Sequence, residues 1–408
     1  MNTRSSVVSR NARRFDVLRG KEERGQVGMS RRRVLIIEEL LSSEALWSTS
    51  SASLRYEATA MLSAVAADMA VVPDVEVTVL LSPAVMQGAV GTSLRLAGVQ
   101  MLSSVAGPQA WLQEPSVSPQ LFTETLVIAP ESAGLLVQRL QQVQSGLWRG
   151  VTNLNVPWSL AAVLGDKAAT AVWLHGHGIR TPPAWVLSDE VACRLQALRV
   201  ADTWDATAWC SGAVSALAGS QCGLYVLKPR DGCGCGDVQL LRLDDQQFRM
   251  VCAEGERVQD AVPGSDLCWL LQPLQAGLPC SAGFVGSGSQ QFVQTPVGQQ
   301  SVVCNSGRFG YEGGSVPAEL TVQQRAWPLL HQLGMALGEF RGWVGVDFVC
   351  GEQVSVIEVN PRLCTSYLGY RQLLRGNLAA LLLGVSRDGS SLWDGCRAVE
   401  WGQRVVVF

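Results

Sequence analysis

Residues 344–363 read VGVDFVCGEQVSVIEVNPRL. Two apolar runs are joined by a short polar segment that contains Gly351, and this pattern predicts a β-hairpin. A two-residue turn formed by Gly351 and Glu352 places Asp347 opposite Val356.

Three polar side chains interrupt the apolar runs of this hairpin: Asp347, Glu358 and Asn360. Because side chains alternate between the two faces of a strand, all three are expected on one face, and the same register places Gly345 opposite Glu358. The opposite face is apolar and carries four residues: Val346, Phe348, Ile357 and Val359. Two carboxylates and an amide oxygen are hard ligands that suit Mg2+, so the polar face predicts a magnesium site. A solvated face that carries surface acids is the alternative.

Lysine is rare in this chain, since only three of the 32 basic residues are lysine. The three are Lys21, Lys167 and Lys228. An ammonium group on a flexible stem suits a single phosphate oxygen, whereas a guanidinium presents a planar fork. Lys167 and Lys228 are therefore candidates for phosphate binding, and chance is the alternative.

A glycine-rich segment, PRDGCGCGD at residues 229–237, follows Lys228 at the end of a predicted strand. Gly232, Gly234 and Gly236 remove side chains from a loop of successive amides, and such a loop can wrap a polyphosphate. The loop lies between two strands and matches neither the P-loop nor the dinucleotide-binding fingerprint. A flexible hairpin tip is the alternative, while the two intervening cysteines are weak evidence for zinc because no further spaced ligands accompany them.

The composition is that of a folded protein. A chain of 408 residues with 47% hydrophobic residues can bury a large core, in roughly two or three domains. The net charge of -3 offers no basic surface for nucleic acid, and no stretch approaches the about 18 apolar residues that a membrane span needs. Twelve cysteines without a Cys-x-x-Cys pair, beside only three histidines, favour reduced thiols and a cytoplasmic location. We therefore expect small-molecule ligands, with no nucleic acid and no membrane.

The N-terminal residues differ from the rest of the chain. Residues 1–33 are rich in Arg and Ser and have little apolar periodicity, so we expect a disordered tail. Met29 just precedes the basic cluster at residues 31–33 and the first predicted strand, so translation from Met29 is an alternative to translation from Met1.

Residues 34–150 alternate strand-like and helix-like segments and predict an N-terminal α/β domain. Strands are expected at residues 34–40, 75–81 and 121–130, and helices at residues 53–71 and 131–145. No glycine fingerprint follows the first strand, where Glu38, Glu39 and Ser42 stand instead. An NAD-linked oxidoreductase is therefore disfavoured.

Residues 151–408 predict an α+β domain built on antiparallel sheets, because hairpins alternate with helices. A helix near Lys167 is expected to end at Gly176 and Gly178, and one helix is expected to run through RQLLRGNLAALLLG, residues 371–384. We divide this part into a small subdomain, about residues 166–275, and a metal-binding subdomain, about residues 276–408.

Five elements of the sequence resemble the ATP-grasp ligases in order and spacing, and the resemblance covers essentially residues 34–408. The elements are Asp166-Lys167, Lys228-Pro229, the glycine-rich loop, Asp347, and the run Glu358-Val359-Asn360-Pro361-Arg362. The resemblance implies an ATP-grasp architecture, in which an N-terminal α/β (pre-ATP-grasp) domain precedes two α+β subdomains that clasp ATP.

The resemblance also implies a set of site residues. Lys167 and Lys228 would contact the ATP phosphates, residues 232–236 would close over them, and Gln272 to Leu274 would form the strand that hydrogen-bonds adenine. The metal ligands would be Asp347, Glu358 and Asn360, and the ion Mg2+, with Mn2+ as the alternative.

The segment NPRLCTSYLGYR, residues 360–371, looks most like the tyramine-glutamate ligases of methanofuran biosynthesis and their bacterial relatives. Cys364 stands where those relatives usually carry Thr, and Pro279 stands where many ATP-grasp enzymes carry an acid that binds the ribose. This closer likeness implies glutamate and tyramine, or a similar amine, as substrates in one-carbon cofactor biosynthesis.

The implied reaction joins a carboxylate to an amine through an acyl phosphate made from ATP. Lys228 and Arg362 are the predicted catalytic residues, because they can offset phosphoryl charge and hold the acyl phosphate or the substrate carboxylate. An ordinary salt bridge is the alternative for Arg362. Thr365, Ser366 and Tyr367 are predicted to shape a substrate pocket, with capping of the following helix as the alternative.

A catalytically inactive nucleotide-binding or scaffold protein of the same fold is the alternative function. The complete set of metal ligands favours the enzyme. A homodimer is one assembly that we consider for this protein.

Overall fold

The structure is a computed structural model, which describes residues 31–104, 117–187, 204–205, 223–232, 234, 237–244, 247–250, 268–305, 307–385 and 399–408. Arg31–Phe408 form one compact unit. The predicted N-terminal tail lies outside the described residues, apart from its last three positions.

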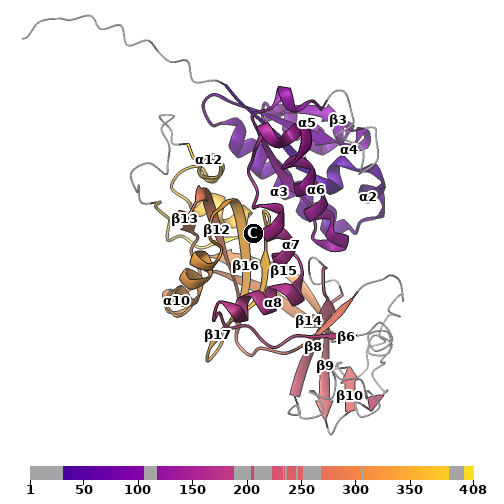
Figure 1. Ribbon diagram of the computed structural model, residues 1–408, viewed down its shortest axis with the longest axis vertical. Coiled ribbons are helices and arrows are strands. Elements are labelled where there is room, and N and C mark those ends of the chain that lie inside the picture. The colour runs from indigo at the N-terminus through magenta and orange to yellow at the C-terminus, as the bar shows by residue number, and fades with distance from the viewer. Residues whose placement is uncertain are drawn as a thin grey trace, which may run out of the picture. The chain divides into compact units, whose positions relative to one another are not determined.

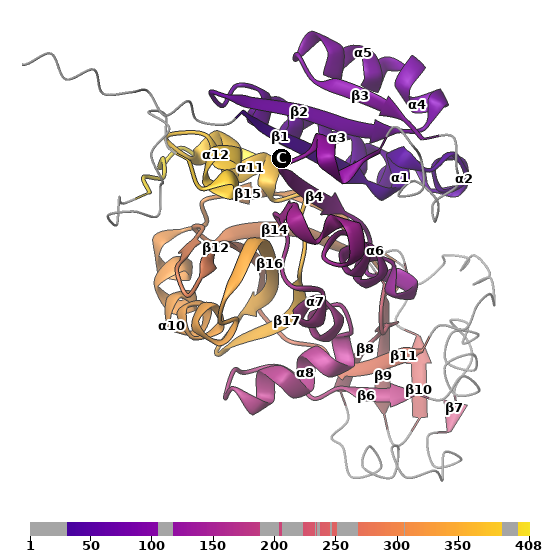
Figure 2. The ribbon, with the colours of Figure 1, turned by 45° about the horizontal axis from the view of Figure 1, so that its top comes forward.

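The first part of the described chain forms a five-stranded parallel sheet in the order β3-β2-β1-β4-β5 (Figures 1 and 2). Its strands are β1 Arg32–Glu38, β2 Val75–Leu81, β3 Gln100–Ser103, β4 Glu124–Ile128 and β5 Thr152–Asn153. The chain runs outward from β1 to β3 and then returns to the other side of β1 at β4. Open parallel sheets bind ligands beyond the carboxyl ends of their strands at such a reversal, which here lies between β1 and β4.

Helices cover both faces of this sheet. They are α1 Glu39–Ser42, α2 Glu44–Thr49, α3 Ala52–Ala70, α4 Pro83–Gln87, α5 Ala89–Leu96 and α6 Leu135–Val143, with short 3-10 segments η2 Pro119–Leu121, η3 Ser132–Gly134 and η4 Gly146–Gly150. Val34 and Ile36 of β1 belong to the core cluster that contains α3, whereas Leu35 and Ile37 belong to the cluster that contains α6. A strand buried on both sides is a continuous apolar run, as residues 34–37 are, so the predicted α/β fold class is confirmed.

The second part forms a thirteen-stranded antiparallel sheet, whose main path is β17-β16-β12-β14-β15-β9-β8-β11-β6 (Figure 1). The strands of this path are β6 Trp185–Leu187, β8 Gly223–Pro229, β9 Gln239–Asp244, β11 Trp269–Pro273, β12 Leu278–Ser289, β14 Gly298–Asn305, β15 Arg308–Val316, β16 Phe340–Cys350 and β17 Val354–Asn360. Four short strands pair beside it: β7 Trp204–Asp205, β10 Gln247–Met250, β13 Phe292–Gln294 and β18 Val406–Val407. The predicted antiparallel α+β architecture is therefore confirmed.

The helices of the second part are α7 Trp158–Leu164, α8 Lys167–Gly176, α10 Leu320–Ala336, α11 Tyr367–Leu373 and α12 Leu378–Leu383. Helix α8 ends as predicted, and Gly178 after it has a φ of +66°, which favours glycine. The single helix predicted through residues 371–384 is wrong. Leu374 is extended and ends α11, and the side chain of Asn377 accepts hydrogen bonds from two backbone N–H groups that begin α12.

The hairpin of β16 and β17 also differs from its predicted register. Asp347 pairs with Glu358 and not with Val356, because the turn spans residues 351–353 and a β-bulge leaves Ile357 without a paired residue. The longer turn and the bulge shift the register by one residue each. Two such shifts restore the side-chain alternation, so Asp347 and Glu358 still face the same side. Ile357, which was predicted on the opposite face, lines the same cavity as these two acids.

None of the described helices has the length and hydropathy that crossing a bilayer requires.

Candidate functional site

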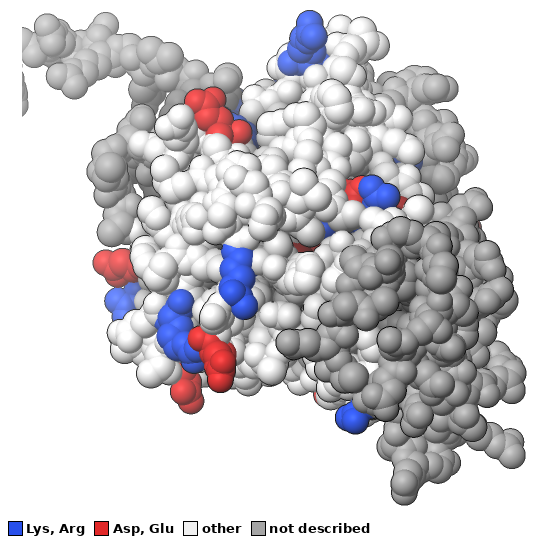
Figure 3. Space-filling model, turned by 60° about the horizontal axis from the view of Figure 1, so that its bottom comes forward, with Lys and Arg blue, Asp and Glu red and all other residues white. Residues whose placement is uncertain are grey.

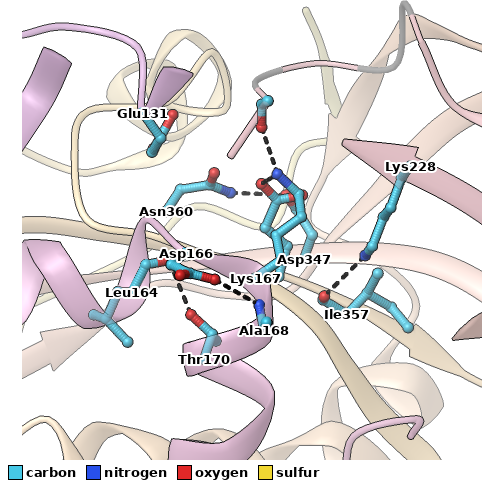
Figure 4. Close-up of polar contacts among 12 residues, drawn as sticks. Glu131, Leu164, Asp166, Lys167, Ala168, Thr170, Lys228, Asp347, Ile357 and Asn360 are labelled. Atoms are coloured by element: carbon cyan, nitrogen blue, oxygen red, sulfur yellow. Dashed lines mark hydrogen bonds and ion pairs between the residues drawn. The ribbon is translucent and has the colours of Figure 1, made fainter. Parts of the chain in front are cut away.

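A cavity of about 440 Å3 lies on the antiparallel sheet. Its walls come from strands β8, β11, β12 and β14 to β17, from the first residue of α8 and from the glycine-rich loop. Its polar lining includes Asp347, Glu358, Lys167 and Lys228, and Asn360 lies next to Asp347 (Figure 4). Its apolar lining includes Val302, Phe309 and Leu274.

The predicted metal ligands lie together. Asp347 and Glu358 are directly opposite each other on β16 and β17. The side-chain amide of Asn360 donates to Oδ2 of Asp347 at 2.9 Å (Figure 4), and the side-chain amide of Gln300 on β14 donates to Oδ1 at 2.7 Å. Gln300 was not predicted, because nothing in the alternating stretch around it signals a partner 47 residues away.

The two carboxyl groups have opposite electrostatic settings. Burial, followed by repulsion from Glu358, raises the pKa of Asp347 from 3.8 to about 7. Burial also acts to raise the pKa of Glu358, but the charges of Lys167 and Lys228 outweigh it and lower that pKa. A divalent cation between the two acids would remove the repulsion, so the donor set fits Mg2+.

Zinc is less compatible with these residues. Within the described part of the chain, no three His, Cys, Asp or Glu side chains are grouped to hold a metal ion. Cys233 and Cys235, the weak zinc candidates, lie outside the described residues. Two acids and one amide oxygen form an oxygen-only set, which is typical of Mg2+ sites.

Lys167 enters the site as the first residue of α8. Asp166 positions it, because the Asp166 carboxylate caps the helix through the backbone N–H groups of Ala168 and Ala169 at 2.9 and 3.2 Å. The ammonium group of Lys167 forms an ion pair with Glu358 at 3.1 Å and donates to the backbone carbonyl of Gly232. The structure therefore joins a predicted phosphate ligand to a predicted metal ligand.

Lys228 reaches the same point from β8. It is 4% exposed, and its ammonium nitrogen lies 3.5 Å from the backbone carbonyl of Ile357, next to Glu358 (Figure 4). The bulge in β17 brings this carbonyl into reach, since the unpaired residue leaves its backbone outside the strand ladder. Both retained lysines thus converge on Glu358 from separate elements.

The described part of the glycine-rich loop contributes to the lining of the cavity. Gly232 and Gly234 line it, and Gly234 has a φ of +73°, which a residue with a side chain rarely adopts. The side chain of Asp231 accepts a hydrogen bond from the backbone of Ala133 at 2.9 Å, which ties the loop to the start of the α6 region. Gly236 lies outside the described residues.

The predicted adenine strand contributes to the cavity lining. Gln272 in β11 is buried, and both Gln272 and Leu274 line the cavity. The backbone N–H of Leu274 already donates to the carbonyl of Leu224 at 2.9 Å. Pro279, which stands where an acid was expected, lines the same wall.

Arg362 forms an ion pair that the sequence did not reveal. Its Nε lies 2.9 and 3.0 Å from the two carboxylate oxygens of Glu131, which follows β4. The salt bridge named as the alternative is therefore present. Arg362 also lines a second cavity, together with Glu38 and Glu57, so the ion pair lies at the edge of a site.

The three predicted pocket residues, Thr365, Ser366 and Tyr367, have different surroundings in the structure. Tyr367 is wrong as a pocket residue, because it is fully buried and its hydroxyl donates to Asp68 at 2.8 Å. Ser366 is also buried and stands at the N-cap of α11 without a side-chain capping bond. Thr365 alone approaches the main cavity, through a hydrogen bond with the hydroxyl of Tyr311.

Charged residues are sparse on one face of the molecule. Figure 3 shows Lys and Arg there as single side chains, several of them beside Asp or Glu. On that view, the described residues form no continuous basic surface.

Comparisons with known proteins agree with this geometry. Residues 164–366 match the family model of the ATP-grasp domain. This range contains both lysines, the glycine-rich loop and all three predicted metal ligands. A comparison with curated protein sequences found no match.

Solved structures share the fold over most of the chain. An ATP-grasp superfamily protein from Archaeoglobus fulgidus is 19% identical with a TM-score of 0.56, covering 86% of this chain and 88% of its own. N5-carboxyaminoimidazole synthetase from Staphylococcus aureus, in complex with ADP, is 14% identical with a TM-score of 0.56, covering 91% and 80%. The biotin carboxylase domain of Hydrogenobacter thermophilus 2-oxoglutarate carboxylase, with MgADP and bicarbonate, is 12% identical with a TM-score of 0.56, covering 89% and 70%.

The family match and the shared fold support each other, since all but one of the described residues that line the cavity lie within residues 164–366. The chain carries an ATP-grasp domain and has the fold of the ATP-grasp superfamily.

Proposed function

We propose that this protein is an ATP-dependent carboxylate-amine ligase that binds ATP and Mg2+ in the cavity of about 440 Å3. One observation carries the proposal. Lys167 and Lys228 converge on Glu358 in a cavity whose remaining lining includes many apolar residues. A nucleoside triphosphate likewise combines a charged tail with a flat base.

The dimensions and chemistry of the cavity support ATP as the nucleotide. Its volume lies within the range of roughly 300 to 1,000 Å3 that is usual for small-molecule sites. Lys167, Lys228 and the loop amides near Gly232 provide donors for the phosphate oxygens. ADP in the Staphylococcus aureus neighbour and MgADP in the Hydrogenobacter thermophilus neighbour agree with this assignment.

The proposed metal site is Asp347, Glu358 and Asn360. When bound there, Mg2+ would supply positive charge to the transferring phosphoryl group, and Mn2+ could take the same oxygen ligands. Gln300 would hold Oδ1 of Asp347 in place, and the Asn360 amide would have to turn to present its oxygen.

The chemistry follows from the weakness of a carboxylate as an electrophile. Transfer of the γ-phosphoryl group of ATP to a carboxylate oxygen gives an acyl phosphate and ADP. An amine nitrogen then attacks the carbonyl carbon, the C–N bond forms, the C–O bond to phosphate breaks, and phosphate leaves. Lys228 would offset the charge of the phosphoryl group, and Arg362 would orient the carboxylate or the acyl phosphate.

The finer assignment concerns the substrates. The similarity of residues 360–371 to tyramine-glutamate ligases supports glutamate as the acid and tyramine, or a related amine, as the acceptor in a pathway like methanofuran biosynthesis. A cytoplasmic location and a homodimer belong to the same proposal. The Hydrogenobacter thermophilus neighbour is described as a dimer, which supports a test of that assembly.

The test is ADP formation from ATP and Mg2+ with a panel of carboxylates that includes glutamate, in the presence of hydroxylamine. Hydroxylamine traps an acyl phosphate as a hydroxamate, so the first half of the reaction is measured without knowledge of the amine. We expect ADP and hydroxamate in equal amounts with one class of acid. ATP binding without ADP formation across the panel would instead favour the inactive nucleotide-binding protein.

A further inference from the structure

A second cavity lies beyond the carboxyl ends of β1 and β4, where the strand order of the parallel sheet reverses. It has a volume of about 70 Å3. Glu38 at the end of β1, Glu57 on α3, Ala129 after β4 and Arg362 all line it. A parallel sheet of this topology commonly binds a ligand at this position, and among the described residues Gly234 is the only one assigned above to ATP or Mg2+ that lines this cavity.

The second cavity lies beside the site of the proposed phosphoryl transfer. Gly234 lines both cavities. The charge of Arg362 acts on Glu38 and Glu57 in the second cavity and on Asp347 in the first. A small group bound next to Arg362 is therefore within reach of an acyl phosphate that Arg362 holds.

The polar lining has an excess of acid. Glu38 is 2% exposed and Glu57 is half-buried, and both face the cavity. Arg362 is the cation in the lining, but it is shared with Glu131 through two short contacts. A buried carboxylate without a full counter-charge is costly, so a positively charged ligand would be favoured here and a phosphate would be repelled.

The remaining wall of the cavity is apolar. Leu54, Ala58 and Met61 line it from α3, one turn or two turns apart on the same helix face. An apolar wall beside two acids suits a molecule that has one charged end and a hydrocarbon body. The small volume admits that charged end and excludes a phosphorylated nucleoside.

Resting on the ligase function proposed above, we infer that the second cavity binds the amino end of the acceptor, a primary amine without a phosphate group, and that Glu38 takes the proton that the ammonium must lose. The proton moves from R–NH3+ to the Glu38 carboxylate, which leaves R–NH2 with a free electron pair. This pair forms the C–N bond as the C–O bond to phosphate breaks. The second nitrogen proton leaves with the phosphate, and Glu38 releases its proton to water after the amide departs.

The surroundings of Glu38 agree with this role. Burial raises its pKa to about 8, against the lowering effect of the Leu41 N–H, which donates to Glu38 Oε2 at 2.8 Å. The charged groups around Glu38 are Glu39 on α1, Glu57 on α3 and Arg362. Arg362 is itself ion-paired with Glu131. A carboxyl group that changes protonation near neutral pH is suited to receive a proton from an amine.

The experiment compares the two half-reactions in wild type and Glu38→Gln, with tyramine and phenethylamine as acceptors and hydroxylamine as the trap. Glutamine keeps the acceptor for the Leu41 N–H, so folding is preserved, and thermal unfolding checks this. We expect kcat/KM for the amines to fall about 100-fold, while hydroxamate formation stays within about twofold of wild type. Glu44→Gln, an exposed acid on α2, is the matched control and should leave both unchanged.

The class of acceptor is tested with a matched pair, ethanolamine and O-phosphoethanolamine, which differ by the phosphate. We expect turnover of ethanolamine to exceed that of its phosphate ester, and Glu57→Gln to raise KM for the amines. Unchanged amine kinetics in Glu38→Gln, or preference for the phosphate ester, would overturn the inference while leaving the ligase proposal intact. Failure of wild type to form any hydroxamate would overturn both.

Discussion

One buried acid of the larger cavity and one buried acid of the smaller cavity have opposite electrostatic settings. In the larger one, Glu358 lies between two lysines, and their charges lower its pKa although burial alone would raise it. In the smaller one, burial dominates and raises the pKa of Glu38 to about 8. The two lysines already neutralise Glu358, which suits a fixed ion site. Glu38 has no full counter-charge, which suits a ligand that supplies a positive charge.

The largest effect is expected at Glu358 in the larger cavity. Glu358→Gln removes a metal ligand and leaves two lysine charges facing each other, so we expect acid-dependent ADP formation to fall about 1,000-fold. Coupled-enzyme measurement of ADP detects this change. Glu352→Gln, in the exposed turn of the same hairpin, is the control. An equal loss in both variants would show that the hairpin, and not the metal ligand, is at fault.

A second prediction concerns the stability of the ligand-free protein. Because the pKa of Glu38 is about 8 when folded and near 4.5 when unfolded, the native state binds more protons between these values. The free energy of unfolding should therefore fall as pH rises from about 4.5 to 8. Glu38→Gln removes this fall, so at pH 8 the variant should be more stable than wild type by roughly 4 kcal/mol, and equally stable near pH 4.

Urea denaturation at pH 4, 6 and 8 measures this difference. Both proteins share every other titratable group, so the comparison isolates Glu38. A difference between the two proteins that does not change with pH would mean that Glu38 has the same pKa in the folded and unfolded states.

A smaller effect, on nucleotide binding, is expected at Lys228, which is one of the two cations beside Glu358. Lys228→Met removes a phosphate donor and an ion partner of Glu358, so the dissociation constant of a non-hydrolysable ATP analogue should rise about tenfold to a hundredfold. Lys228→Arg should not restore binding, because the planar fork does not fit a buried point-charge position. Calorimetric titration tests both variants. Wild-type affinity in Lys228→Arg would remove the special role of lysine.

The smallest effect is expected at the support for Lys167. Asp166 forms an ion pair with Arg230 at 2.6 Å, and both side chains are partly exposed, at 27% and 35%. Asp166→Asn keeps the helix cap but loses the charge, so the free energy of unfolding should fall by less than about 1 kcal/mol. Asp166→Ala also loses the cap and should cost about 1 kcal/mol more. Equal losses in chemical denaturation would mean that the cap contributes nothing.

The predictable parts of the site were those that lie close together in sequence. The grouping of Asp347, Glu358 and Asn360 follows from the alternation within one hairpin, and it survived a two-residue error in register because the period is two. The bulge at Ile357 could not be read, since no glycine or proline marks it. The architecture was predictable because strand and helix periods differ along the whole chain.

The unpredicted parts depend on contacts between distant segments. Glu131 and Arg362 are 231 residues apart, and their pairing needs the end of β4 to lie beside the end of β17. Glu38 was noticed only as the place where a glycine fingerprint is missing. A sequence shows that an acid follows a strand, but not which cavity that strand end reaches.

The two proposed binding sites draw on different sheets, which has a consequence for how this protein could acquire new specificities. The lysines and metal ligands belong to the antiparallel sheet and its first helix, whereas Leu54, Glu57 and Met61 come from α3 on the parallel sheet. A transplant of α3 from a relative could therefore retune the choice of acceptor without touching the energy-consuming half of the reaction. Sequence differences in this helix among related proteins would be the first place to look for a changed amine specificity.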